Sequence, residues 1–157
     1  MKLYRAFAGL ALAAVAAAAV PVSAANVTAD PQAIATVLKA QGAEATIGKD
    51  TKGDPKIDAS FGENELFTVY FYGCTNNANC DNVQLYAGYT ESSVDGPRLI
   101  EWNRTRRYGR AYIDETGDPA VEMDVSLREG GMSTELFVDN LETWHEVMNA
   151  FSDFIYE

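Results

Sequence analysis

The most regular pattern of apolar residues lies near the C-terminal end of the chain. Apolar side chains recur there at steps of three and four residues, which is the spacing of one face of an α-helix. They are Phe137, Leu141, Trp144, Met148, Phe151 and Ile155. Ser133 can cap this helix, and Glu135 falls in its first turn. Leu136, Val147 and Phe154 widen the stripe, so it either packs across a sheet, which we favour, or is reserved for a partner.

Capping residues predict two shorter helices. Asp30 is suited to cap the first, with Pro31 at its first position, and Gly42 ends it. The apolar stripe of this helix consists of Ile34, Val37 and Leu38. Gly96-Pro97 begins the second helix, which extends to about Thr105.

Six runs of residues predict β-strands. They are rich in Val, Ile, Thr, Phe and Tyr and are separated by turn residues, which is typical of strands. The first four follow one another as an antiparallel meander, and the last two form a further pair. The runs cover residues 44–50, 55–62, 65–73, 82–90, 110–114 and 120–127.

Two of the loops between strands repeat one motif. The segments "DTKGDPKI" (50–57) and "DETGDPAV" (114–121) share Asp-x-x-Gly-Asp-Pro. Aspartate and glycine suit a tight hairpin turn, and proline suits the start of the outgoing strand. Calcium loops are the alternative, but neither segment has the spacing of oxygen ligands that an EF-hand loop uses. We therefore predict two matched hairpin turns.

A signal peptide is predicted over residues 1–24. Two basic residues precede an apolar run of mostly alanine, and small residues stand before the cleavage position. A retained membrane anchor is the alternative, but the run is shorter than the roughly 20 residues that span a bilayer. We expect cleavage after Ala24 or Ala25, and a periplasmic or secreted single domain over residues 25–157.

The charge of the chain limits its partners. The formal net charge is −11, and removal of the basic leader makes it more negative. Such a charge favours solubility and opposes binding to nucleic acid or to anionic membrane surfaces. We therefore expect no nucleic acid as a partner and, after signal cleavage, no membrane.

Both cysteines lie in the exported part, as Cys74 and Cys80 in "GCTNNANC". In an oxidising compartment, two cysteines that flank a polar loop between apolar strands predict a disulfide across the mouth of a hairpin. A metal site needs more ligands than this neighbourhood offers, and redox chemistry prefers the spacing Cys-x-x-Cys.

Few residues suggest catalysis. The single histidine, His145, falls between Glu142 and Glu146 on the polar side of the last helix, which predicts a solvated surface residue. The sequence contains no Gly-x-Ser-x-Gly motif and no phosphate-binding glycine loop, and its many carboxylates single out no pair. We expect no catalytic residue, no bound metal and no cofactor.

A cluster of arginines stands out in this acidic chain, within "EWNRTRRYGRAY" (101–112). These arginines either pair with strand carboxylates such as Glu122 and Asp124, or form an anion or peptide-carboxylate site beside Trp102. We expect one of Arg106 and Arg107 to be structural and the other to be exposed. The candidate binding residues are Trp102, Asn103, Arg106, Arg107 and Arg110.

The chain resembles the YbjN domain family, in the exported bacterial branch that carries the cysteine pair. The resemblance covers about residues 30–155, through "DTKGDPKI", "VYFYGC", "LYAGY", "EWNRTRRYGRAY", "DETGDPAVEMDV" and "DNLETWHEVMNAFSDFI". Its most specific part is Trp102-Asn103-x-x-Arg106-Arg107-Tyr108-Gly109-Arg110. It implies an α+β domain similar to type III secretion chaperones, with a twisted antiparallel sheet, a short N-terminal helix, a middle helix and a long C-terminal amphipathic helix.

The resemblance also implies a regulator of sensory transduction and brings no established catalytic residues. Because a shared fold does not transfer function, the chaperone likeness concerns the fold alone. We expect an exported, non-enzymatic binding or regulatory module that engages a protein or peptide through its sheet face or the Trp102 region, with a homodimer left open. A periplasmic sensor of small molecules or ions is the main alternative, and an uncharacterised hydrolase is a further one.

Overall fold

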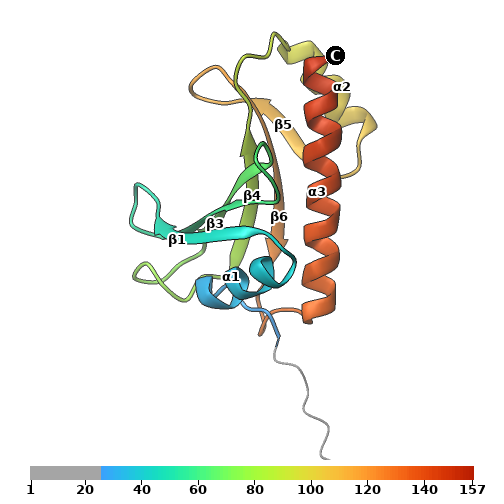
Figure 1. Cartoon of the computed structure of the whole chain (residues 1–157). Helices are drawn as coiled ribbons and strands as arrows, with labels where there is room; N and C mark the ends of the chain where they lie inside the picture. Colours follow the sequence, from blue (N-terminus) through green and yellow to red (C-terminus); the bar gives the residue numbers. More distant parts are fainter. Residues whose placement is uncertain (1–25) are drawn as a thin grey trace, which may run out of the picture.

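The computed structural model describes residues 26–157, which form one six-stranded sheet and three helices (Figure 1). The strands are β1 (Glu44–Lys49), β2 (Pro55–Ser60), β3 (Leu66–Tyr72), β4 (Asn82–Gly88), β5 (Arg110–Ile113) and β6 (Pro119–Ser126). The helices are α1 (Pro31–Ala40), α2 (Gly96–Thr105) and α3 (Thr134–Tyr156). Each element lies where the sequence predicts it, and the α+β class with a long C-terminal helix is confirmed.

The helices begin at capping side chains. Asp30, Asp95 and Ser133 each accept a hydrogen bond from a backbone N–H of the following first turn, at 2.8, 3.0 and 3.2 Å. Each bond satisfies one of the donors that the start of a helix leaves free. The predicted caps of α1 and α3 are confirmed, and Asp95 supplies the cap of α2.

The sheet is antiparallel throughout, in the order β1-β2-β3-β4-β6-β5. Successive side chains of a strand point to opposite faces of the sheet. One set is apolar and buried in the core, and includes Ile57, Val69, Leu85 and Val121. Figure 1 shows α3 running along the side of the sheet that this core occupies. We call the opposite side, which carries the other set of side chains, the open face.

Helix α3 closes the core with the predicted stripe. All six of its residues are buried, and the rings of Trp144 and Phe151 meet aromatic side chains of the sheet side. Burial of such a side chain stabilises the fold by about 1.5–3 kcal/mol each. The interpretation as a core-facing helix is confirmed. Of the residues that widen the stripe, Val147 is buried, Phe154 is partly buried, and Leu136 is 51% exposed.

The two Asp-x-x-Gly-Asp-Pro segments are hairpin turns of the same geometry, as predicted. In each, the first aspartate, Asp50 or Asp114, accepts backbone hydrogen bonds two and four residues further on, at 2.8–3.1 Å. The glycines Gly53 and Gly117 have φ of 91° and 92°. Glycine suits this position because left-handed backbone is strained for other residues. One oxygen of each first aspartate is therefore occupied by its own backbone.

The predicted disulfide between Cys74 and Cys80 is present. It closes the loop between β3 and β4, and this loop packs on the β1–β2 turn. The side-chain amide of Asn77 donates a hydrogen bond to Asp54 at 2.9 Å. The bridge therefore fixes a loop that holds two separate hairpins together.

The predicted signal peptide lies outside the described residues. Within residues 26–157, no helix has both the length and the apolar character that a bilayer-spanning helix requires.

Candidate functional site

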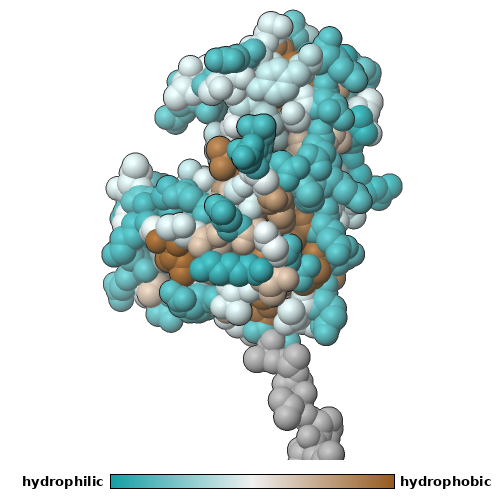
Figure 2. Space-filling model, in the orientation of Figure 1, coloured by the Kyte–Doolittle hydropathy of each residue, from teal (hydrophilic) through white to brown (hydrophobic). Residues whose placement is uncertain are grey.

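The open face carries aromatic and polar side chains. Four tyrosines lie on it at alternate strand positions, namely Tyr70, Tyr72, Tyr86 and Tyr112. The rings of Tyr70 and Tyr86 meet edge to face, 5.8 Å apart. Figure 2 shows that apolar patches in this view are small and bordered by hydrophilic residues, and that the outline is hollowed beside the β5–β6 turn.

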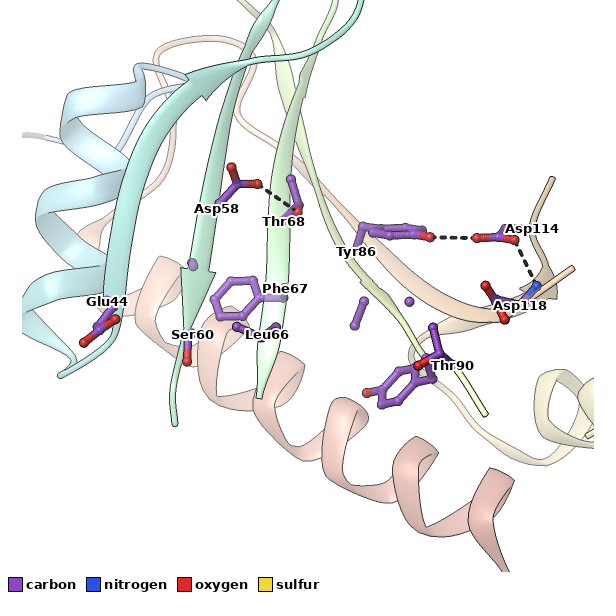
Figure 3. A pocket seen from close by; sticks show the side chains of 14 residues that line it. Glu44, Asp58, Ser60, Leu66, Phe67, Thr68, Tyr86, Thr90, Asp114 and Asp118 are labelled. Atoms are coloured by element: carbon purple, nitrogen blue, oxygen red, sulfur yellow. Dashed lines mark hydrogen bonds between the residues drawn. The ribbon is translucent and has the colours of Figure 1, made fainter. Parts of the chain in front are cut away.

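A cleft opens on this face where the sheet divides. The pairing of β3 with β4 ends at Thr68 and Tyr86. Beyond that point β3 remains paired with β2 as far as Leu66, and β4 remains paired with β6 as far as Gly88, so the two halves of the sheet separate. The separation leaves a cleft of about 550 Å³ (Figure 3). Buried Phe67 lies at its apolar base, and Leu66, which is 67% exposed, lies at its edge. We call this space the open-face cleft.

The open-face cleft is acidic. Four carboxylates line it, and none of its lining residues is a lysine or arginine. They are Glu44, Asp58, Asp114 and Asp118. A lysine outside the lining, Lys56, pairs with Asp58 at 2.8 Å and offsets part of this charge. The remaining charge gives the cleft a negative potential that attracts cations.

Hydrogen bonds fix the protonation of one side of the cleft. The hydroxyl of Thr116, together with the backbone N–H of Asp118, holds the pKa of Asp114 below its usual range. Burial, followed by the charge of Asp114, raises the pKa of Tyr86 to about 12. The Tyr86 hydroxyl donates to Asp114 at 3.3 Å. At neutral pH this pair is a carboxylate and a neutral phenol.

Beside the cleft, a carboxylate is buried on the open face. Glu122 is only 4% exposed, and it accepts hydrogen bonds from Arg110 and, at 2.9 Å, from the Tyr112 hydroxyl. Arg110 and Glu122 face each other across the β5–β6 pair. Of the predicted partners, Glu122 is thus paired with an arginine of the cluster, whereas Asp124 accepts from the Gln84 amide at 3.1 Å.

Trp102 and Asn103 hold α2 to β5. Trp102 is 1% exposed, and its indole N–H donates to the carbonyl of Gly109 at 2.8 Å. The amide of Asn103 bonds both the N–H and the carbonyl of Ala111, each at 2.8 Å. Of the five candidate binding residues, these two and Arg110 therefore have structural contacts.

Arg106 and Arg107 are both exposed, which corrects the expectation that one of them is structural. Neither forms an ion pair with a carboxylate of residues 26–157. The guanidinium of Arg106 lies 5.1 Å from the ring centre of Trp102. Neither arginine pairs with a strand carboxylate because α2 ends at Thr105, which leaves both in the connection to β5. Of the cluster, Arg110 alone lies at the strand position opposite Glu122.

This connection faces α3 across a small hollow of about 170 Å³. We call it the arginine hollow. It is lined by Trp102, Arg106, Arg107, Tyr108, Thr143, Glu146, Val147 and Ala150.

His145 is a surface residue as predicted, with 39% of its side chain exposed, but it also makes tertiary contacts. Its ring stacks on Phe61, with 4.5 Å between ring centres, and its Nε2 lies 3.2 Å from a carboxylate oxygen of Glu65. Both partners belong to the β2–β3 connection, which the fold places beside α3. The helix pattern alone could not show this contact because it depends on tertiary packing.

Sequence reasoning missed the open-face cleft. The alternation of polar and apolar residues in β3 indicates an exposed face, with Thr68, Tyr70 and Tyr72 on it. It does not indicate where the pairing of β3 and β4 stops. The cleft follows from that end of pairing, so no local pattern predicts it.

The described residues thus form an α+β domain with a helix-covered core and an open sheet face that holds an acidic cleft, which is a candidate binding site. Residues 30–157 match the sequence model of the YbjN family, which is described as "Putative bacterial sensory transduction regulator". The chain belongs to this family. The description is that of a regulator and not of an enzyme. No curated protein and no solved structure gave a match, so the likeness to type III secretion chaperones stays a prediction.

Proposed function

We propose that the protein is an exported, non-enzymatic regulatory module whose open-face cleft binds a short basic and apolar segment of a partner protein. The observation that carries the proposal is the acidic lining of the cleft over an apolar base. Membership of a family of regulators supports a binding role. The disulfide supports export, because such bonds persist in oxidising compartments.

The chemistry of the cleft favours a basic segment. Its charged lining residues are all acidic, and the chain as a whole carries a formal charge of −11. Such a field attracts lysine and arginine side chains and repels acidic ones. Phenol rings such as that of Tyr86, which remains neutral at physiological pH, also provide faces for cations.

The shape of the cleft favours an extended segment with apolar residues. Phe67, Ala59 and Ala87 are buried in its base, and Leu66 stands exposed at its edge. In an extended peptide, alternate side chains point in opposite directions. One set can therefore cover Phe67 and Leu66 while the other reaches the carboxylates at the rim.

The test is direct binding of a labelled hexapeptide of alternating lysine and leucine, measured by fluorescence anisotropy with the mature, disulfide-bonded protein. We expect saturable binding that weakens with added salt, and no binding of the matched peptide of alternating glutamate and leucine. Leu66→Ser should weaken binding because it removes apolar contact at the edge. Asp58→Asn should weaken it too, since Lys56 is then no longer neutralised.

The matched control is Leu136→Ser. Leu136 is similarly exposed, but it lies on α3 and does not line the cleft. It should leave peptide binding unchanged. The proposal is overturned if both peptides bind equally, or if Leu66→Ser and Leu136→Ser behave alike.

A further inference from the structure

The arginine hollow places opposite charges on its two sides. Arg106 and Arg107 lie on the connection between α2 and β5, and Glu146 lies on α3. None of the three forms an ion pair within residues 26–157. The hollow therefore separates two guanidinium groups from a carboxylate instead of joining them.

The fold holds these two sides in place. Thr143, Glu146, Val147 and Ala150 follow the three- and four-residue spacing of one helix face, so they present a single surface to the hollow. On the other side, the Trp102 indole bonds the carbonyl of Gly109 and anchors the connection at its end. The connection thus keeps a fixed position against α3.

The wall of the hollow is apolar between these charges. Trp102 and Val147 are buried, and Ala150 is partly buried. The volume of about 170 Å³ is well below the roughly 300–1,000 Å³ typical of sites for drug-sized ligands. A small ligand that carries opposite charges on a short apolar body fits this arrangement.

We propose that the arginine hollow binds a small zwitterionic α-amino acid. The planar forks of Arg106 and Arg107 suit the ligand's carboxylate, because guanidinium groups can make two parallel hydrogen bonds to it. Glu146 accepts from the ammonium group, and the side chain lies against Val147 and Ala150. This site is separate from the open-face cleft and does not depend on the function proposed for it.

The test is an NMR titration of the mature, disulfide-bonded protein with L-alanine, following the amide signals of residues 105–109 and 143–150. Propionate lacks the ammonium group and ethylammonium lacks the carboxylate, so they serve as matched ligands. We expect saturable shifts with L-alanine and about tenfold weaker binding, or more, for either analogue, because each loses a charged hydrogen bond.

Variants test separately the groups proposed to bind the ligand's carboxylate and its ammonium group. Arg107→Ala and Glu146→Gln should each weaken L-alanine about tenfold, and both side chains are exposed, so folding should be intact by circular dichroism. Arg104→Ala is the control, since Arg104 is exposed on α2 and does not line the hollow. Absence of saturable shifts overturns the proposal. Equal binding of propionate and L-alanine, or an unaffected Glu146→Gln variant, overturns the zwitterion assignment.

Discussion

Gly109 is a position where a single added carbon should be costly, because it lies between the sheet and α3. Its φ is 78°, and a Cβ there would lie 2.5 Å from Val147 and 2.9 Å from Val121. The left-handed conformation costs a non-glycine residue about 1–2 kcal/mol, and overpacking adds roughly 1–3 kcal/mol. We expect Gly109→Ala to lower the free energy of unfolding by about 3 kcal/mol, which corresponds to a loss of about 4 °C in Tm for each kcal/mol.

Gly117→Ala separates strain from collision. Gly117 has a φ of 92°, but no atom lies within 4 Å of the added carbon. The free energy of unfolding of this variant, measured by urea denaturation, should fall by only about 1 kcal/mol, since backbone strain is the sole cost. Adding Val147→Ala to Gly109→Ala should relieve the collision, so the double variant should be more stable than the sum of the single losses predicts. Equal losses at Gly109 and Gly117, or simple additivity, would refute this reasoning.

Four further predictions concern charge, pH, metal and export. Arg110→Ala should cost about 2 kcal/mol in urea unfolding because it leaves buried Glu122 with one donor, and Glu122→Gln in the same protein should recover part of that loss. Because the pKa of Asp114 is lowered in the folded protein, the ionised carboxylate stabilises the fold at pH values above the ordinary carboxyl pKa. This contribution is lost as the pH falls through the lowered pKa. Asp114→Asn should therefore flatten the decline of the free energy of unfolding below about pH 4. Millimolar calcium should leave Tm unchanged if both hairpin turns are purely structural, whereas a rise would indicate metal binding. Intact-mass measurement of exported protein should show a start at Ala25 or one residue later and no free thiol, and a retained leader would contradict the signal-peptide prediction.

The fold follows from local patterns to an unusual extent here. The stripe of α3 has a helical period, the strand runs are bounded by turn residues, and the repeated aspartates and glycines specify two hairpins. Each of these signals lies within a few residues of the element that it predicts. Local propensity and tertiary structure therefore agree, and the boundaries are right to within one or two residues at most ends.

The site depends on distant residues and could not be predicted in the same way. Which arginine meets Glu122 is decided by the β5–β6 register, which places Arg110 opposite it and leaves Arg106 and Arg107 in the preceding turn. The stacking of His145 on Phe61 likewise requires α3 to cross the β2–β3 connection. The sequence identified the cluster correctly as unusual but could not divide it into a structural and an exposed part.

The Asn103 amide makes the two ends of the sheet unequal. It bonds the outward N–H and carbonyl of Ala111 as a neighbouring strand would, so β5 offers no free backbone pair at that position. At the other end, no hydrogen bond within residues 26–157 occupies the outer side of β1. An added strand would therefore meet occupied backbone groups at Ala111 but unoccupied ones along the outer side of β1. Asn103→Leu would remove both hydrogen bonds and so give the sheet a second edge with backbone groups to which another chain could hydrogen-bond.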